Sequence, residues 1–184
     1  MNLNQIEEKY NTLLKAIKIC KDNDFVEPVF ILLFSTIDSL SWLNSNEINI
    51  EHRNGKEEFK NFSQEYILNR LTQNITPDEF YDARCAIVHT ISAKSKNNKK
   101  NGTRYLTYSN SAESELEGNN NLKMLNENAV CINVFELLTA LVNAITEFFN
   151  NISKDENKKK NVTKENATGC EIGVFDADKN ILYY

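Results

Sequence analysis

The stretch TPDEFYDARCAIVHT, residues 76–90, contains the strongest helix-start signal in the chain. Thr76 is a good N-cap residue, Pro77 suits the first helical position, and Glu79 stands where its side chain can complete a capping box. Apolar residues then recur at helical spacing. The sequence therefore predicts a helix here, and this helix carries both Arg84 and His89.

Apolar periodicity predicts helices on both sides of this stretch. Apolar residues recur at intervals of three and four, which is the spacing of one face of a helix. We expect further helices at about residues 3–20, 25–43, 56–71 and 134–152. The second of these is apolar on every side and should be central, and Asn133 with Glu136 should cap the last. The fold class is therefore all-α, a helical bundle of about five helices.

Shorter segments predict minor β elements and a division of the chain. Alternating residues indicate strands at about 103–108 and 130–133, and the turn-rich DADKN indicates a C-terminal hairpin. Residues 154–168 are polar and highly charged, which is typical of a flexible linker. We therefore expect a helical domain over residues 1–153, a linker over 154–168 and a hairpin extension over 169–184.

Composition limits the class of protein. The 184 residues carry a net charge of −5, which argues against a general nucleic-acid coat. The four cysteines are scattered, so a disulfide framework or a zinc ribbon is not expected. The N-terminal segment lacks the features of a signal peptide, and the longest apolar run is too short to span a bilayer. We expect a cytoplasmic protein without a membrane partner.

One carboxylate interrupts the most apolar predicted helix. Asp38 lies within FILLFSTIDSLSWL, residues 30–43. Burying an unpaired carboxylate is costly, so Asp38 needs a partner, and Arg84 is the obvious candidate. Under one interpretation Arg84 has only this structural role.

Aromatic side chains are expected to fill the core of the bundle. This set comprises Phe25, Phe30, Phe34, Trp42, Phe59, Phe62, Phe148 and Phe149. Tyr105 and Tyr108 flank a basic segment and are expected to pack a strand against the bundle. Stacking of these two tyrosines on a nucleobase is the alternative.

A basic segment follows the predicted Arg84/His89 helix directly. Between His89 and Tyr105 there is no acidic residue, and the cations are Lys94, Lys96, Lys99, Lys100 and Arg104. Such a segment would attract a polyanion, although most runs of this kind are solvated loops. We take these five residues as candidate ligands of a polyanion.

The residue pattern resembles the HEPN superfamily (higher eukaryotes and prokaryotes nucleotide-binding). The resemblance rests on Arg-x4-His within YDARCAIVHT, on a capped helix preceded by the apolar helix around Asp38 and followed by the basic segment. It implies a helical bundle that forms a homodimer with a shared cleft. It also implies a metal-independent endoribonuclease of bacterial toxin–antitoxin or phage-defence systems, with RNA and an antitoxin or defence-system protein as partners.

The resemblance also assigns roles to residues. Arg84 would hold the scissile phosphate and His89 would act as general base or acid, with Asp38 and Cys85 in support and the basic segment on the RNA. The 2'-hydroxyl of RNA would attack the adjacent phosphate and leave a cyclic phosphate. Histidine moves protons near neutral pH, and the arginine fork matches phosphate oxygens. No cofactor or metal is implied.

Two features depart from this pattern. Many active members have a polar residue after the arginine, where this chain has Cys85. At about 100° per residue, Arg84 and His89 lie roughly 140° apart on an ideal helix. Either Arg84 curls over its small neighbours, or the two groups meet across a dimer.

Three other interpretations remain open. Asp82, Cys85 and His89 share a helical face and could hold a soft divalent metal. The protein could also be a non-catalytic helical module that binds RNA or a protein partner. It could, finally, be a structural adaptor that uses the bundle and hairpin only for assembly.

Overall fold

The computed structural model describes residues 2–45, 50–92, 100, 102–124, 128–168, 173–176 and 179–183. These residues are mostly helical, as the sequence predicts. The α-helices are α1 (Leu3–Asp22), α2 (Val26–Asn44), α3 (Gly55–Tyr66), α4 (Pro77–Thr90), α6 (Ala112–Met124), α7 (Val134–Lys154) and α8 (Glu156–Thr168). Short 3-10 helices η1 (Ile50–His52) and η2 (Leu68–Arg70) flank α3. The strands are β1 (Tyr105–Ser109), β2 (Ala129–Asn133), β3 (Gly173–Asp176) and β4 (Lys179–Tyr183).

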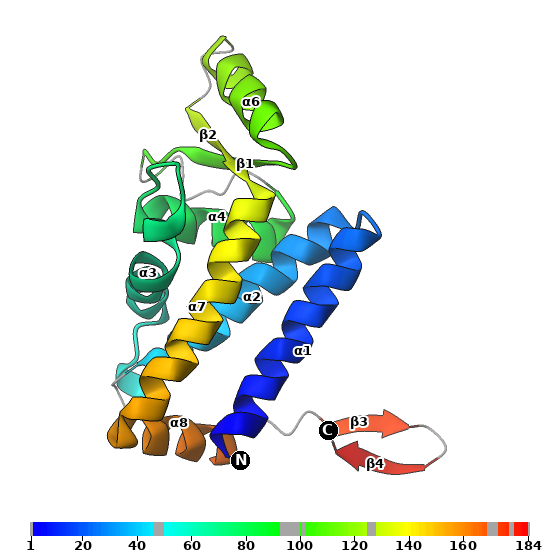
Figure 1. The fold of residues 1–184 in the computed structure, drawn as a ribbon, viewed down its shortest axis with the longest axis vertical. Coiled ribbons are helices and arrows are strands. Elements are labelled where there is room, and N and C mark those ends of the chain that lie inside the picture. The colour runs from blue at the N-terminus through cyan, green and yellow to red at the C-terminus, as the bar shows by residue number, and fades with distance from the viewer. Residues whose placement is uncertain are drawn as a thin grey trace.

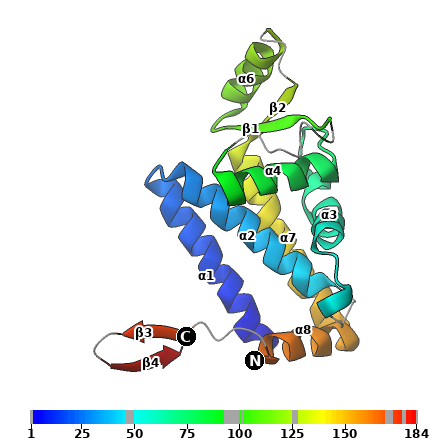
Figure 2. The same ribbon diagram turned by 180° about the vertical axis from the view of Figure 1, so that it is seen from behind.

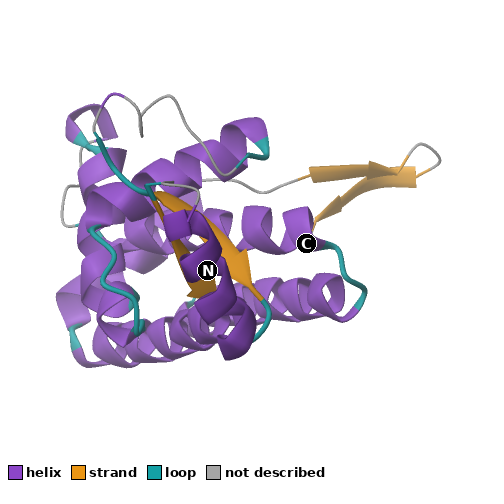
Figure 3. Cartoon of the chain, turned by 90° about the horizontal axis from the view of Figure 1, so that it is seen from above, coloured by secondary structure: helices purple, strands orange, loops and turns teal. Residues whose placement is uncertain are grey.

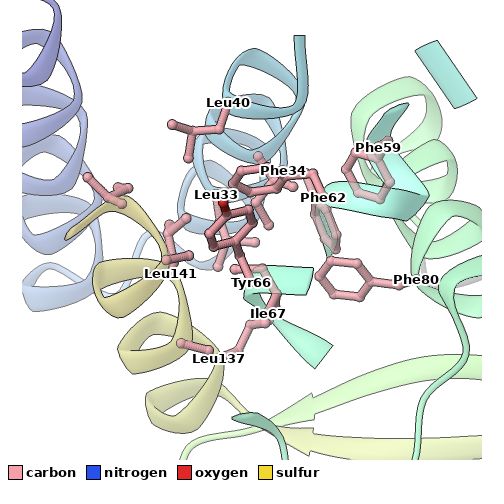
Figure 4. Packing of buried hydrophobic residues seen from close by; sticks show 14 of the residues in the cluster. Leu33, Phe34, Leu40, Phe59, Phe62, Tyr66, Ile67, Phe80, Leu137 and Leu141 are labelled. Carbon is pink, nitrogen blue, oxygen red and sulfur yellow. The ribbon is translucent and has the colours of Figure 1, made fainter. Parts of the chain in front are cut away.

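Helix α2 lies at the centre of the bundle. Helices α1, α2 and α7 run alongside one another, α8 crosses one end, and α4 with the β1–β2 pair lies toward the other (Figures 1 and 2). Phe34 of α2, Phe59 of α3 and Phe80 of α4 meet in the core (Figure 4), with ring centroids 5.2 Å apart for Phe34–Phe80 and 5.8 Å for Phe59–Phe80. These rings fix α4 against α2 and α3.

The aromatic prediction is correct for six residues and wrong for two. Phe30, Phe34, Phe59, Phe62, Phe148 and Phe149 are buried. Phe25 is 55% exposed and Trp42 is 38% exposed. These two residues lie at opposite ends of α2, where the helix leaves the centre of the bundle.

The expected caps form at the start of α4 and α7. Thr76 and Glu79 make a reciprocal capping box, and Pro77 occupies the first turn of α4. The Asn133 side chain accepts from the backbone N–H groups of Phe135 and Glu136. The Glu136 carboxylate, however, accepts from the backbone N–H and the hydroxyl of Thr72 at 2.6 and 3.0 Å. Glu136 therefore ties α7 to the segment before α4.

Helix α4 ends immediately after His89, at an unusual residue. Ile91 has φ 47° and ψ 48°, which is the left-handed region, and its side chain is 63% exposed. A β-branched residue pays a steric cost in this region. The backbone N–H groups of Ile91 and Ser92 donate to the carbonyls of Ile87 and Ala86, so the helix end is closed without glycine.

The two predicted internal strands pair in parallel, with Leu106 opposite Val130 and Tyr108 opposite Ile132. A parallel pair requires a crossover, and α6, which the periodicity did not predict, provides it. The Asn119 side chain of α6 accepts from the backbone N–H of Cys131 at 2.8 Å. A Cβ on Gly118 would lie 3.1 Å from the Cys131 sulfur, so glycine permits the close approach of α6 to β2.

The predicted flexible linker over residues 154–168 is wrong, because α8 occupies most of it. Asp155 caps this helix by accepting from the backbone N–H groups of Asn157 and Lys158, at 3.0 Å each. Val162 is 2% exposed and joins the core, while the remaining residues of α8 are mainly polar. One cap and one apolar anchor therefore suffice for a helix that composition disfavours.

The C-terminal hairpin forms as predicted, with antiparallel strands β3 and β4. It lies outside the helical bundle (Figures 1 and 3). Among the described residues, α2 alone is long and apolar enough to cross a membrane. Half of that apolar stretch is buried inside the bundle, as in the core helix of a soluble protein.

Candidate functional site

Arg84 connects α4 to the centre of α2. Its Nε lies 2.7 Å and its Nη2 lies 2.6 Å from Oδ2 of Asp38. The two side chains are 20% and 29% exposed, so the ion pair is partly buried. The predicted partner of Asp38 is confirmed.

The charge of Arg84 is reinforced by this contact. Burial alone would lower the pKa of the guanidinium, but the hydrogen bond and charge of Asp38 outweigh it and raise the pKa of Arg84 above its ordinary value. Arg84 is therefore a fixed cation whose direction is set by Asp38.

Arg84 also reaches His89 within the same chain. Its Nη1 lies 3.1 Å from Nε2 of His89 and 4.0 Å from the Cys85 sulfur. Of the two routes considered above, Arg84 takes the intrahelical one and passes the small Cys85. The 140° divergence of an ideal helix is overcome by the length of the arginine side chain.

This contact specifies a tautomer of His89. A guanidinium has only donors, so Nε2 of His89 must be the acceptor and the proton of a neutral imidazole must lie on Nδ1. His89 is exposed at the last turn of α4. The imidazole therefore lies beside a cation, with its ring within reach of solvent.

A cleft of about 320 Å³ opens beside Arg84, between α2, α3 and α4. Its walls are Asp38, Ser41, Trp42, Gly55, Lys56, Glu58, Tyr81 and Arg84. Burial, followed by the neighbouring Cys85, raises the pKa of Tyr81, so this wall residue keeps its proton at neutral pH. The cleft combines two cations, two carboxylates and two aromatic rings next to the Asp38–Arg84–His89 chain of contacts.

Of the five basic residues predicted to contact RNA, Arg104 has a structural role. Its Nε and Nη2 donate to the two carboxylate oxygens of Glu79 at 2.6 and 2.9 Å, and Glu79 is only 6% exposed. Lys100 is exposed. Lys94, Lys96 and Lys99 lie outside the described residues.

The remaining candidates from the sequence are placed as follows. Asp82 is buried and accepts from the Thr103 hydroxyl at 2.7 Å, so it does not share an open face with Cys85 and His89. Across the described ranges, no group of three or more His, Cys, Asp or Glu side chains is arranged to hold a metal. Tyr108 packs on Phe30 with ring centroids 4.1 Å apart, which is the expected packing role.

Trp42, Lys56 and Glu58 were not singled out as site residues by the sequence. They come from the end of α2 and the start of α3 and meet only when these helices pack. The one usable signal is Trp42 itself, since it is the only tryptophan of the chain and stands at the edge of an apolar helix. Comparisons of the chain with protein-family models, curated proteins and solved structures found no match.

Proposed function

We propose that this protein is a metal-independent endoribonuclease of the HEPN type. The observation that carries the proposal is the continuous chain of contacts from Asp38 through Arg84 to His89. It joins a fixed cation to an exposed imidazole, a pair that could supply charge stabilisation and proton transfer for RNA cleavage by a 2'-hydroxyl.

The residues divide the chemistry between them. On RNA binding Nη1 of Arg84 turns from His89 to the phosphate, and the freed Nε2 of His89 takes the proton of the 2'-hydroxyl, whose oxygen attacks the adjacent phosphorus while the bond to the 5'-oxygen breaks. Arg84 donates to the phosphate oxygens as negative charge develops on them. Asp38 positions Arg84. The products are a 2',3'-cyclic phosphate and a 5'-hydroxyl, whose proton comes from water or from a second imidazole.

The proposal includes a setting. A homodimer would supply that second imidazole from the partner's copy of α4. A cleavage activity of this kind in a bacterial cell fits a toxin–antitoxin or phage-defence role, in which an antitoxin or defence-system protein controls the RNase. Each of these partners is part of the proposal.

A second function is favoured by one specific observation. Arg84 already satisfies the partly buried Asp38, which is what a purely structural arginine would do. In that case the helical bundle binds RNA or a protein without cleaving it.

Cleavage in the presence of a chelator separates the two functions. Labelled single-stranded RNA is incubated with EDTA and wild type, Arg84→Ala or His89→Ala. His52→Ala is the matched control, since His52 is the only other histidine and is exposed outside the cleft. Cleavage that Arg84→Ala and His89→Ala abolish and His52→Ala retains supports the RNase. If wild type retains RNA without cleaving it, the RNase proposal is wrong and the non-catalytic binding function stands.

A further inference from the structure

Beside Arg84, the cleft defined above has the features of a site for one nucleotide. Its volume of about 320 Å³ falls at the lower end of the range for small-ligand sites. It is open to solvent next to the residues proposed to cleave RNA. The occupant should therefore be small, and it should carry a phosphate that can lie against Arg84.

The cations of the cleft suit that phosphate. Arg84 and Lys56 both line it, and the Asp38 carboxylate is already neutralised by two donors of Arg84. A guanidinium has further N–H groups beyond those used by Asp38 and His89. Nζ of Lys56 lies 5.4 Å from the centroid of the Tyr81 ring and makes a loose contact with Asp78, at 3.6 Å between two well-exposed side chains. Such an exposed pair is weak and yields readily to a phosphate.

Trp42 suits the base. The guanidinium of Arg53 lies 3.4 Å from the Trp42 ring centroid and covers one face of the ring. Trp42 as a residue remains 38% exposed and lines the cleft. A held aromatic ring with exposed surface is a stacking platform for a base.

Glu58 supplies an unmet hydrogen-bond acceptor. Its Oε1 accepts from Ser45 at 2.7 Å and from Arg53 at 3.1 Å. Its Oε2 is shielded from water, and no donor in the described part of the chain reaches it. Glu58 lines the cleft, and a shift of its side chain on binding would bring this oxygen to an N–H donor of the occupant, which would satisfy it.

We propose that this cleft is the nucleobase subsite of the RNA substrate and that Glu58 determines which base it takes. Guanine offers two adjacent N–H donors on its Watson–Crick edge and should bind best. Uracil, whose single N–H lies between two carbonyl oxygens that repel a carboxylate, should bind worst. This inference rests on the proposed function for its substrate, although binding of a nucleotide can be measured without cleavage.

Trp42 makes the test direct, because it is the only tryptophan of the chain. GMP, AMP, CMP and UMP are titrated in EDTA against full-length wild type, Glu58→Gln, Lys56→Ala and Lys60→Ala, with Trp fluorescence and calorimetry as readouts. Lys60 lies on the same helix but outside the cleft and serves as the matched control. We expect saturable binding with GMP at least tenfold tighter than UMP.

The variants show which residue binds the base and which binds the phosphate. Glu58→Gln should reduce the preference for GMP over UMP to threefold or less, whereas Lys56→Ala should weaken all four nucleotides by a similar factor and Lys60→Ala should change nothing. Lys56→Ala alters an exposed side chain and keeps the test sound if Glu58→Gln does not fold. Absent binding, equal affinity for all four nucleotides, or an unchanged order in Glu58→Gln overturns the proposal.

Failure of this inference is distinguishable from failure of the proposed function. Cleavage of RNA by wild type without base preference or nucleotide binding would leave the RNase and remove the subsite. Ordered nucleotide binding without RNA cleavage would leave the subsite and remove the RNase. His89→Ala should retain nucleotide binding while losing cleavage, since His89 does not line the cleft.

Discussion

Replacing Arg104 with alanine should destabilise the fold rather than remove an RNA contact. The change leaves the Glu79 carboxylate, 6% exposed, without the two donors that contact it at 2.6 and 2.9 Å. Breaking a fully buried pair costs about 3–5 kcal/mol. Arg104 is 36% exposed and Thr76 still donates to Glu79, so screening reduces the expected loss to about 2 kcal/mol.

Thermal unfolding followed by circular dichroism measures this loss. In a chain of this length, 1 kcal/mol corresponds to about 2–4 °C, so Tm should fall by about 4–8 °C. Lys100→Ala, an exposed change in the same basic segment, should leave Tm unchanged. In a double-mutant cycle, Glu79→Gln should make most of the Arg104→Ala loss disappear. An unchanged Tm in Arg104→Ala, together with weaker RNA retention, would refute the structural role.

Acid should weaken the fold partly through Glu79. Burial would raise the pKa of Glu79, but the hydrogen bonds from Arg104 and Thr76 outweigh burial and lower it. The stability that Glu79 contributes is therefore present above the unfolded pKa of about 4.3 and is lost as pH falls through the lower folded pKa. Glu79→Gln should flatten this part of an acid titration of the free energy of unfolding. Asp38→Asn should lower stability by about 2 kcal/mol in urea unfolding and slow RNA cleavage, because Arg84 loses its charged anchor; equal cleavage by the variant would contradict the positioning role. His89→Ala should leave Tm within about 1–2 °C of wild type, since the side chain is exposed, and a larger fall would indicate a structural histidine. Val162→Asp should detach α8, because it buries an unpaired charge, and limited proteolysis should then cut within residues 156–168; continued protection would place the anchor of α8 elsewhere.

The sequence predicts those helices whose caps and apolar periodicity lie within their own residues. The capping box at Thr76 and the apolar periodicity of α1, α3 and α7 lie within single segments and are legible without the fold. Helix α6 has a polar sequence with an internal glycine. The glycine is explained by the close approach of Gly118 to Cys131, which lies on the strand that follows α6. Helix α8 depends on the Asp155 cap and on the burial of Val162. Both helices are stabilised by long-range contacts, which periodicity does not report.

In the candidate site, too, the sequence predicts contacts that a single segment indicates and misses contacts that depend on how the helices pack. Asp38 is a carboxylate among apolar residues, so the sequence indicates that it needs a partner. Arg84 is the partner that the sequence predicts, and the structure shows this pair. Angular spacing left two routes open for Arg84 and His89, and the reach of the arginine side chain decides for the contact within one chain. Counting charges did not reveal the ion pair of Arg104, because this pair depends on a glutamate on another element. The cleft around Trp42 arises only where the end of α2 meets the start of α3.

The position of Asp38 has a consequence for biosynthesis. Its partner stands 46 residues later, so a ribosome completes the whole of α2 well before the residue that neutralises its carboxylate exists. During that interval the most apolar helix of the chain, with the length of a membrane span, has nothing from α4 to cover it. A chain terminated before Arg84 would keep α1 and α3 beside this helix but would lack the second half of α4 and all of α7, and the Asp38 carboxylate in its middle would have no arginine partner. Such fragments should be handled by chaperones and proteases instead of accumulating as a folded bundle.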